Sequence, residues 1–424
     1  MDRFTTLQPH PAAPVAVALR GERRGASPAD AAGRVARDRR DHPSSDTPVK
    51  RVALAHDYLL VMRGAERTFA AIADIYPRAP IFTLLHDARA TDGRFAGHPI
   101  TTSALQLLGM DQASFRRALP LYPLAVERLK LSGVDVVVSS SSAFAHGVRV
   151  PEGAVHVCYC HTPFRYAWDE ERYALGEIAP ALRPLVRRQL RRIRRWDLAA
   201  SRRVDAYVAN SELSRERIRR NYRRDAPVIH PPVETHRFCP GTPGDALLVV
   251  SEVVRHKRLP LALEAARRAR VPIRVVGSGP DLLAIKRAYP EAEFLGRVDD
   301  GALAELYASA RAVLVPSVEE FGITAVEAQA AGRPVIAAAA GGARETVIDG
   351  QTGRLARLDD VDAFVRAIES IDSLDFDPQR AVRNAARFSV AAFQERLRAQ
   401  VSAVCEGLPK PEWDALRVSA NGVR

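Results

Sequence analysis

The sequence predicts an α/β protein with two Rossmann-like, doubly wound domains that face a central cleft. Short apolar runs alternate with helical patterns from residue 51, and the same alternation begins again near residue 245. In addition, a chain of 424 residues is too long for one ordinary hydrophobic core. Two domains of similar construction account for both the length and the repeat.

Residues 1–48 are rich in Ala, Pro, Arg and Asp and show no sustained periodicity. This composition predicts a disordered N-terminal extension. Its apolar patch is too short for the core of a signal peptide, and no apolar run approaches the roughly 18 residues of a membrane span. We therefore expect a cytoplasmic protein.

The first domain is predicted over residues 49–230. Helical segments separate most of its apolar runs, which indicates βαβ units and a parallel sheet. The strands are expected at the runs VALAHDYLL, PIFTLL, VDVVVSS, VHVCYC and VDAYVANS.

The second domain is predicted over residues 231–385 and begins at Pro231-Pro232, a pair that stiffens the crossing between domains. Its strands are expected at the runs ALLVVSEV, IRVVGSG, AEFLGRV, AVLVPS and PVIAAA. Residues 386–407 are predicted as a helix that returns to the first domain, and residues 408–424 as a tail.

The cysteines do not form a metal-binding pattern. A Cys-x-Cys inside an apolar strand lacks the usual ligand spacing, so we expect reduced thiols. The four positions are Cys158, Cys160, Cys239 and Cys405.

The net charge of +12 is concentrated in residues 183–224, which we call the basic segment. It holds 15 arginines and four acidic residues, a local charge of +11. Such a surface attracts the phosphates of nucleic acid, anionic lipid or a diphosphate substrate. A solvated helix face is an equally weighted interpretation, since a chain with five lysines uses arginine as its general surface cation.

Ligands of parallel α/β sheets bind beyond the carboxyl ends of the strands, so the residues after each apolar run are the candidates. Gly64 opens a helix whose amides suit a phosphate, although an ordinary turn also explains it. His161 follows the run VHVCYC, and a lone histidine is more often structural. Gly277 and Gly279 form a Gly-x-Gly that predicts a tight turn, without the third glycine of a dinucleotide-binding loop.

Three basic residues, Arg255, Lys257 and Arg258, lie on the loop before the helix LPLALEAARRAR. Cations at a helix N-terminus oppose its dipole, and a bound anion would resolve that conflict. A solvated basic loop is the plain alternative. No P-loop sequence occurs anywhere in the chain, which argues against a P-loop NTPase.

The stretch SVEEFGITAVEAQAAG (317–332) follows the apolar run AVLVP. The amides of Phe321, Gly322 and Ile323 can open a helix toward a diphosphate. A carboxylate accepts two hydrogen bonds from ribose hydroxyls, so Glu327 suits a ribose, and Glu319 can reach the other end of the same ligand. Either acid alone is better explained as a surface residue, but both at one strand end favour a ligand.

These residues together resemble the family-4 retaining glycosyltransferases of GT-B fold over about residues 51–400. The strongest carriers are EEFGITAVEAQAAGRPVIA (319–337), which matches the family's Glu-x7-Glu motif, and GGARETVIDGQTG (341–353). HDYLLVMRGAER, YCHTPFRYAWD, RRWDLAASRRVDAYVANS and VIHPPVETHRF look like a subgroup of bacterial polysaccharide enzymes, often mannosyltransferases.

The resemblance implies a role for each matching position. Glu327 would hold the donor ribose, Glu319 would face the transferred sugar and its phosphate, and His161 would sit near the reacting carbon. The donor diphosphate would meet Lys257 and Gly64, while the amides of 321–323 would bind sugar hydroxyls and phosphate. Gly277 and the Leu295-Gly296-Arg297-Val298 stretch would line the base pocket.

One departure from the family concerns the diphosphate. The family usually has an arginine five or six residues before the lysine, but Glu252 stands five residues before Lys257. Either Arg255 or Arg258 substitutes for it, or the charge is neutralised differently. A second departure is Glu320, where the family usually has glycine.

The activity implied is transfer of a hexose, foremost mannose from GDP-mannose, to a lipid-linked saccharide with retention of configuration. No metal is expected, because Lys257 and helix amides would stabilise the leaving group. The basic segment would dock to anionic lipid at the inner face of the cell membrane. Alternatives are a UDP-hexose donor, a GT-B nucleotide-sugar 2-epimerase and, more distantly, a nucleic-acid-binding protein.

Overall fold

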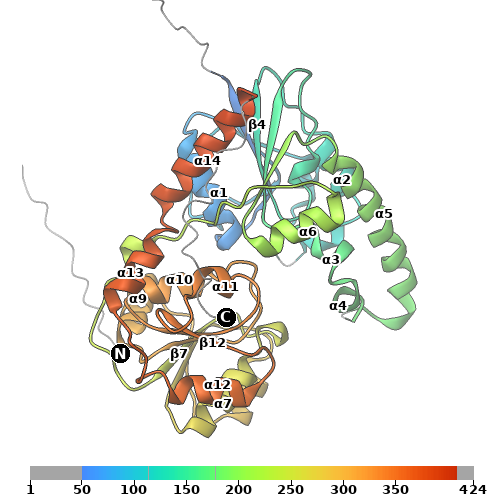
Figure 1. Ribbon diagram of the computed structural model, residues 1–424. Helices are drawn as coiled ribbons and strands as arrows, with labels where there is room; N and C mark the ends of the chain where they lie inside the picture. The colour runs from blue at the N-terminus through green and yellow to red at the C-terminus, as the bar shows by residue number, and fades with distance from the viewer. Residues whose placement is uncertain (1–49, 113, 177, 408–424) are drawn as a thin grey trace, which may run out of the picture. The chain divides into compact units, whose positions relative to one another are not determined.

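The computed structural model describes residues 50–407, apart from residues 113 and 177 and the side chain of Tyr173. The predictions for residues 1–48 and 408–424 lie outside this range. Two parallel six-stranded sheets confirm the predicted α/β fold with two Rossmann-like domains (Figure 1). Within the described residues, no helix is long and apolar enough to cross a membrane.

The first sheet has the strand order β3-β2-β1-β4-β5-β6. Its central strand β4, with the sequence VVVSSS, is buried along its whole length, as expected for a strand covered on both faces. The strands are β1 (Val52–Leu59), β2 (Ile81–His86), β3 (Ile100–Thr102), β4 (Val136–Ser141), β5 (Val155–Cys160) and β6 (Ala206–Ala209).

The second sheet repeats this topology with the order β12-β11-β10-β7-β8-β9. Its strands are short and are built from Val, Leu, Ile and Ala, which fit a sheet covered on both faces. They are β7 (Leu247–Val250), β8 (Ile273–Val276), β9 (Glu293–Gly296), β10 (Val313–Val315), β11 (Val335–Ala338) and β12 (Gly353–Ala356).

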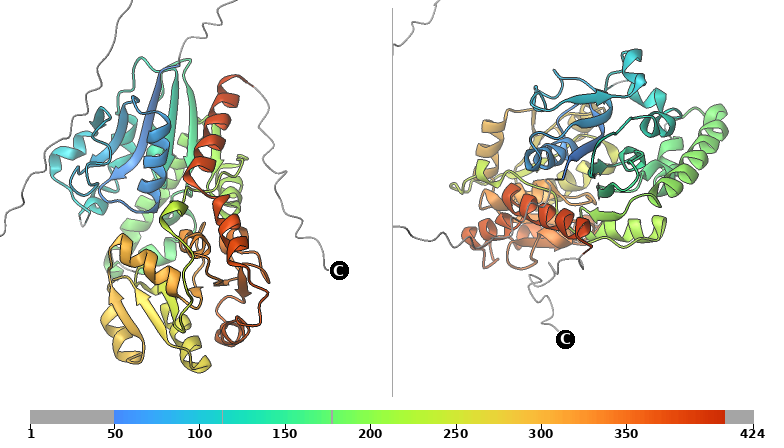
Figure 2. Two further views of the ribbon diagram at one scale, coloured as in Figure 1. Left: turned by 90° about the vertical axis from the view of Figure 1, so that its left-hand side faces the viewer. Right: turned by 90° about the horizontal axis from the view of Figure 1, so that it is seen from above.

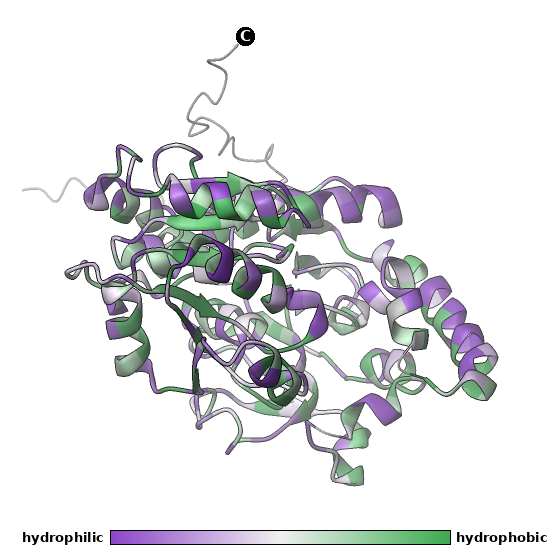
Figure 3. Ribbon diagram, turned by 90° about the horizontal axis from the view of Figure 1, so that it is seen from below, coloured by the Kyte–Doolittle hydropathy of each residue, from purple (hydrophilic) through white to green (hydrophobic). Residues whose placement is uncertain are grey.

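Helices pack on the sheets, and some of them begin at a residue whose side chain caps the helix. Asp299 and Ser389 each accept a hydrogen bond from a backbone N–H of the helix that follows, α9 and α14. The strands are mostly hydrophobic, while the helices carry hydrophilic residues on one side (Figure 3). The helices of the first domain are α1 (Gly64–Ile75), α2 (Tyr122–Glu127), α3 (Arg165–Trp168), α4 (Glu171–Gly176), α5 (Arg183–Ser201) and α6 (Glu212–Tyr222).

The helices of the second domain include one that opens at the predicted Phe-Gly. They are α7 (Leu259–Ala269), α8 (Leu282–Ala288), α9 (Asp300–Ser309), α10 (Ile323–Ala330), α11 (Ala343–Thr346), α12 (Val361–Glu369) and α13 (Pro378–Ala386). Short 3-10 turns connect some elements: η1 (Ala104–Leu108), η2 (Phe115–Ala118), η3 (Ala145–Gly147), η4 (Pro180–Leu182), η5 (Thr235–Arg237) and η6 (Arg255–Lys257).

The last helix, α14 (Val390–Cys405), leaves the second domain and packs on the first, beside α1 (Figures 1 and 2). Its residues Phe393, Leu397 and Val401 are buried in the same apolar cluster as strand residues of β1. The side chain of Gln394 donates a hydrogen bond to the Ala71 carbonyl at 3.0 Å. This helix therefore completes the core of the first domain.

Both sheets reverse their strand order between two central strands, β1 and β4 in the first and β7 and β10 in the second. A crevice forms at the carboxyl ends of the strands on either side of such a reversal. Residues after these four strands are therefore the ones that the fold brings to a ligand.

Candidate functional site

A cavity of about 450 Å³ lies between the two domains, at these strand ends. We call it the donor cavity. It is lined by the segments after β1 and β4 from the first domain and after β7 and β10 from the second. It brings together half of the predicted site residues: Gly64, His161, Lys257, Glu319, Phe321, Gly322 and Ile323.

Lys257 and Glu319 form an ion pair on the wall of the donor cavity. Lys257 Nζ donates to both carboxylate oxygens of Glu319, at 2.8 and 2.6 Å. The hydroxyl of Ser317 donates to the same carboxylate. About a quarter of each side chain is exposed, 24% and 21%, so a ligand can reach both charges.

The Phe-Gly turn at the start of α10 is shaped by a close contact between two loops. Gly322 has φ +88°, a left-handed conformation that glycine adopts without strain. The Gly342 N–H donates to the Glu319 carbonyl at 2.9 Å. A Cβ on Gly342 would lie 2.1 Å from the Phe321 carbonyl oxygen, so only glycine allows this approach.

Glu327 lies one turn into α10 and is not part of the cavity lining. Its Oε2 accepts a hydrogen bond from the Tyr307 hydroxyl at 2.7 Å. Burial raises the pKa of Glu327, while that hydrogen bond opposes the shift. The carboxylate is thus oriented by Tyr307, a residue that no sequence pattern singled out.

His161 reaches the cavity at the end of a polar chain. Its Nε2 lies 2.9 Å from Ser140 Oγ, which in turn lies 3.2 Å from His56 Nδ1. Burial lowers the pKa of His161 to about 4, so the imidazole is neutral near pH 7. The ring therefore offers a polar contact without adding positive charge.

Gly64 begins α1 and faces the second domain. A Cβ built on Gly64 would lie 3.3 Å from Ile323 Cδ1, so the two predicted residues meet across the cavity. Glu66 accepts a hydrogen bond from the Arg63 N–H at 3.1 Å, and burial raises the pKa of Glu66 to about 7. Gly64, in the first turn of α1, thus lies on the wall of the cavity.

Glu252, which stands where the family has an arginine, lines the cavity and is opposed by Arg63. Arg63 NH1 lies 3.8 Å from Glu252 Oε2, with 57% and 48% of the side chains exposed. Arg63, the residue just before Gly64, thus places a cation beside Glu252, the position at which the family usually has an arginine.

Besides Glu327, six predicted donor-binding residues do not line the donor cavity: Arg255, Arg258, Gly277, Leu295, Arg297 and Val298. Arg258 is ion-paired with Asp359 at 2.7 Å. A Cβ on Gly277 would lie 1.9 Å from the Ser251 carbonyl oxygen, so the close packing of the two backbones by itself explains the glycine at this position. Leu295 and Val298 pack against the apolar core of the second domain, and Arg297 is exposed.

The structure adds cavity residues that the sequence reasoning missed. Ser142 follows β4, Thr162 and Arg165 follow β5, and Asn210 follows β6. The strand-end rule points to each of these positions as well. The sequence does not single them out, because the rule identifies the loop after each strand and not the side chains of that loop that face a ligand.

Asp57, within the motif HDYLLVMRG, clamps the loop after β4. Its carboxylate accepts four backbone hydrogen bonds from residues 142–145, at 2.6 to 3.0 Å. It is 3% exposed, and burial raises its pKa against the effect of these hydrogen bonds. The clamp holds Ser142 at the edge of the cavity.

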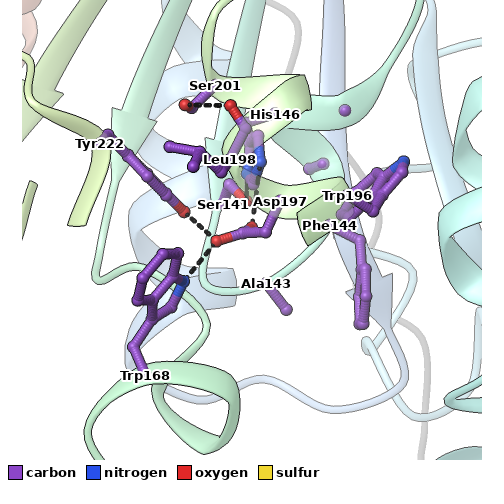
Figure 4. Close-up of polar contacts among 12 residues, drawn as sticks. Ser141, Ala143, Phe144, His146, Trp168, Trp196, Asp197, Leu198, Ser201 and Tyr222 are labelled. Carbon is purple, nitrogen blue, oxygen red and sulfur yellow. Dashed lines mark hydrogen bonds and ion pairs between the residues drawn. The ribbon is translucent and has the colours of Figure 1, made fainter. Parts of the chain in front are cut away.

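A second buried carboxylate, Asp197 of α5, anchors the elements behind the cavity (Figure 4). It is fully buried and accepts hydrogen bonds from Trp168 Nε1 at 2.6 Å and the Tyr222 hydroxyl at 2.9 Å. His146 Nε2 lies 3.2 Å from its other oxygen. This residue ties α3, α5, α6 and η3 together.

Polar contacts also join the two domains around the cavity. Arg217 of α6 pairs with Glu320 at 3.0 Å, so the residue that replaces the family's glycine has a partner in the first domain. Nearby, Glu345 contacts His230 at 2.8 Å and accepts from the Glu212 N–H. Among residues 50–407 without 113 and 177, no group of three or more His, Cys, Asp or Glu side chains is placed to hold a metal ion.

Two family models match the chain. Residues 62–237 match the model described as Glycosyltransferase Family 4, and residues 241–388 match the model described as Glycosyl transferases group 1. Together they cover both domains with a gap at residues 238–240.

The chain is similar to proteins named D-inositol 3-phosphate glycosyltransferase. That of Actinosynnema mirum is 34% identical over 189 residues, 36% of this chain and 45% of the relative. A second, from Catenulispora acidiphila, is 32% identical over 230 residues, 45% of this chain and 54% of the relative. The chain thus spans about half the length of these curated relatives.

Two solved structures share the fold at low identity. Anabaena HepE in complex with UDP has a TM-score of 0.61 and 18% identity, over 83% of this chain and all of that one. Sucrose-phosphate synthase from Thermosynechococcus elongatus has a TM-score of 0.64 and 19% identity, over 84% of this chain and all of that one.

Proposed function

We propose that this chain, which belongs to the family-4 glycosyltransferases of GT-B fold, transfers a hexose from a nucleotide sugar to an acceptor hydroxyl. The observation that carries this proposal is the Lys257–Glu319 pair in a cavity lined by both domains. A lysine beside helix-opening amides suits a diphosphate leaving group, and a carboxylate beside it suits sugar hydroxyls.

The proposed reaction proceeds with retention and without a metal. The bond between the anomeric carbon and the diphosphate oxygen breaks, and its electron pair stays on that oxygen. The acceptor oxygen forms the new bond from the same face, and its proton passes to a donor phosphate oxygen. Lys257, the 321–323 amides and the N-terminus of α1 would stabilise the departing charge, so catalysis rests on positioning and electrostatics.

GDP-mannose is the proposed donor, from the resemblance to polysaccharide mannosyltransferases. A UDP-hexose is the alternative. A thermal-shift panel of GDP-mannose, UDP-glucose, UDP-galactose, GDP and UDP tests both, because a ligand of the native state raises the melting temperature. We expect GDP-mannose and GDP to give the largest shifts. Larger shifts with the UDP compounds would identify a UDP-hexose as the donor instead. No shift with any compound of the panel would refute the proposal.

The proposed acceptor is a lipid-linked saccharide in surface-polysaccharide assembly, met at the inner face of the cell membrane. Four arginines of α5 are exposed and have no ion-pair partner among the residues that the structure describes: Arg188, Arg191, Arg192 and Arg195. Leu182 and Leu185 are 53% and 66% exposed beside them. Cations next to exposed leucines suit an anionic lipid surface.

Vesicle co-sedimentation tests the membrane proposal. We expect binding to vesicles with anionic lipid, weaker binding to neutral vesicles, and loss when the four arginines are replaced by glutamine. Binding that depends on neither lipid charge nor salt would refute it. If the same variant loses heparin binding but keeps lipid binding and sugar transfer, the segment serves nucleic acid or another polyanion instead.

A second candidate acceptor is a small phosphorylated polyol, since the curated relatives are named for D-inositol 3-phosphate. A 2-epimerase of the same fold would need no acceptor at all. Incubating the donor with and without acceptor separates these functions: a transferase forms a glycoside only with acceptor, and an epimerase changes the donor sugar without one.

A further inference from the structure

A second cavity, of about 500 Å³, adjoins the donor cavity, and we call it the second chamber. It is lined by residues 255–258 and 318–320 of the second domain, and by α3, α6 and Glu170 of the first. The two cavities share Arg165, Lys257, Glu319 and Glu320. A ligand in the second chamber would therefore lie beside the transferred sugar.

The second chamber is rich in cations. Five Arg or Lys side chains line it, against three carboxylates. Three of the cations are engaged in ion pairs of 3.0 Å or less: Lys257 with Glu319, Arg217 with Glu320, and Arg258 with Asp359. The remaining two are Arg165 and Arg255.

Arg165 and Arg255 have guanidinium groups without strong partners. Arg165 NH1 lies 3.8 Å from Glu170 Oε1, and no hydrogen bond joins the Arg165 guanidinium to a described residue. Arg255 is exposed on η6 and has neither an ion pair nor a side-chain hydrogen bond with any residue in the described part of the chain. A guanidinium presents N–H donors in a planar fork that matches a phosphate, so this wall suits a phosphate group.

The turn that carries Arg165 is anchored in the protein interior. Arg165 begins α3, and Trp168 at its other end donates to the buried Asp197 (Figure 4). The Ala167 carbonyl of the same turn accepts from Arg194 Nε. These contacts fix the backbone from which the Arg165 side chain reaches the second chamber, as a binding site requires.

We propose that the second chamber binds a phosphate group carried by the acceptor, with Arg165 and Arg255 as its ligands. This inference rests on the proposed function and names the chemical class of the acceptor. With its phosphate in the second chamber, the acceptor can place a hydroxyl at the shared wall, next to the anomeric carbon. A phosphorylated polyol and a lipid diphosphate both carry this group.

Calorimetric titration of the full chain tests the inference, with and without a saturating nucleoside diphosphate. The probes are D-inositol 3-phosphate, a short-chain prenyl diphosphate and, as the unphosphorylated control, inositol. We expect saturable binding of at least one phosphorylated probe in the presence of nucleotide, and none of inositol. The probe that binds more tightly identifies the source of the phosphate.

Three variants locate the binding. Arg255→Gln and Arg165→Gln are each expected to weaken the binding of the phosphorylated probe at least about tenfold. Arg255→Lys keeps the charge but loses the planar fork of N–H donors. Its affinity for the probe should therefore lie between those of the wild type and Arg255→Gln. Arg287→Gln, at an exposed arginine of α8 that lines neither cavity, is the matched control and should bind normally. Circular dichroism checks that each variant is folded.

Several results would overturn the inference: no saturable binding of either phosphorylated probe, equal binding of inositol, or normal affinity in both Arg255→Gln and Arg165→Gln. Displacement of the probe by nucleotide would place the phosphate in the donor cavity and also overturn it. Failure of every nucleotide to bind would refute the proposed function instead. The titration without nucleotide still decides this inference, because Arg255 lies outside the donor cavity lining.

Discussion

Lys257 Nζ lies 2.6 Å from Glu319 Oε2, although 62 residues separate them in the chain. The lysine belongs to η6 before α7, and the glutamate to the loop after β10. A donor diphosphate that binds Lys257 must share it with this carboxylate or replace it. The two residues therefore act as one unit, and their substitution should show coupling.

Lys257→Ala is expected to lower kcat by roughly a hundredfold to a thousandfold, about 2.7–4 kcal/mol, as for a lost oxyanion donor. Glu319→Gln should also lower it. Because each change breaks the same pair, the double variant should lose less than the sum, with a coupling energy of about 0.5–3 kcal/mol. Steady-state kinetics measures the cycle, and Lys286→Ala, an exposed lysine of α8, is the control. Additive effects, or near-normal kcat in Lys257→Ala, would contradict this assignment.

Gly342→Ala is expected to weaken donor binding at least about tenfold. Its Cβ would lie 2.1 Å from the Phe321 carbonyl oxygen, so the Phe-Gly turn must move, at a stability cost of about 1–3 kcal/mol. Nucleotide titration and thermal melting measure the two effects. Gly97→Ala is the matched control, since nothing lies within 4 Å of the position of its Cβ. Unchanged donor affinity in Gly342→Ala would show that this contact does not shape the site.

Asp57→Ala should destabilise the first domain by several kcal/mol, because it leaves four backbone N–H groups unpaired, and the three that are buried cost about 1–3 kcal/mol each. Asp57→Asn should rescue little, since its NH2 group replaces one oxygen that accepts two of these hydrogen bonds and places N–H donors against them. Urea unfolding measures both variants. Asp135→Asn, at an exposed pair with Arg51, is the comparison and should be nearly neutral. Wild-type stability in Asp57→Asn would mean that the clamp needs only one oxygen.

Arg63→Gln should weaken nucleotide binding several-fold, whereas Glu252→Gln should strengthen it. Arg63 places a cation beside the predicted diphosphate position at Gly64, and Glu252 places an anion there. Both side chains are about half exposed, so the effects should shrink as salt rises. Titrations at low and high salt measure them. A change of the same sign in both variants would contradict the assignment of Arg63 as the replacement cation.

Acid is expected to destabilise the first domain through three buried histidines. Burial lowers the pKa of His56 and His156 to about 3 and that of His161 to about 4. The unfolded chain binds protons on these groups below about pH 6.5 and the folded chain does not, so stability falls as pH drops from about 6.5 toward 3. At pH 5 the penalty is on the order of 2 kcal/mol for each group at most.

Glu66 acts in the opposite direction. Burial raises its pKa to about 7, so the folded chain holds this proton and loses the resulting stability as pH rises from about 4.5 to 7. Urea unfolding between pH 5 and 8 measures the sum, and three histidines should outweigh one glutamate below pH 6.5. His156→Gln, which keeps a partner for Ser139, should remove about a third of the histidine term. A stability that does not fall between pH 6.5 and 5 would contradict these shifts.

The strand-end rule predicted several segments that line the donor cavity, because parallel sheets gather the carboxyl ends of their strands in one place. His161, Lys257, Glu319 and the 321–323 turn all reach the donor cavity for that reason. The same rule does not say which side chains of a loop face the ligand. Arg165 and Ser142 were missed, and Arg258 turns to Asp359 instead.

The sequence by itself determined the alternation of strands and helices, the repeat of that alternation, and the Glu-x7-Glu stretch. These are local patterns, because each can be recognised from the residues of a single run. Tertiary structure alone decided the long-range polar contacts: Arg63 opposite Glu252, the Asp57 clamp, and the placing of Arg165 and Arg255 on one wall of the second chamber. Each depends on how segments far apart in the chain are packed, which no local pattern contains.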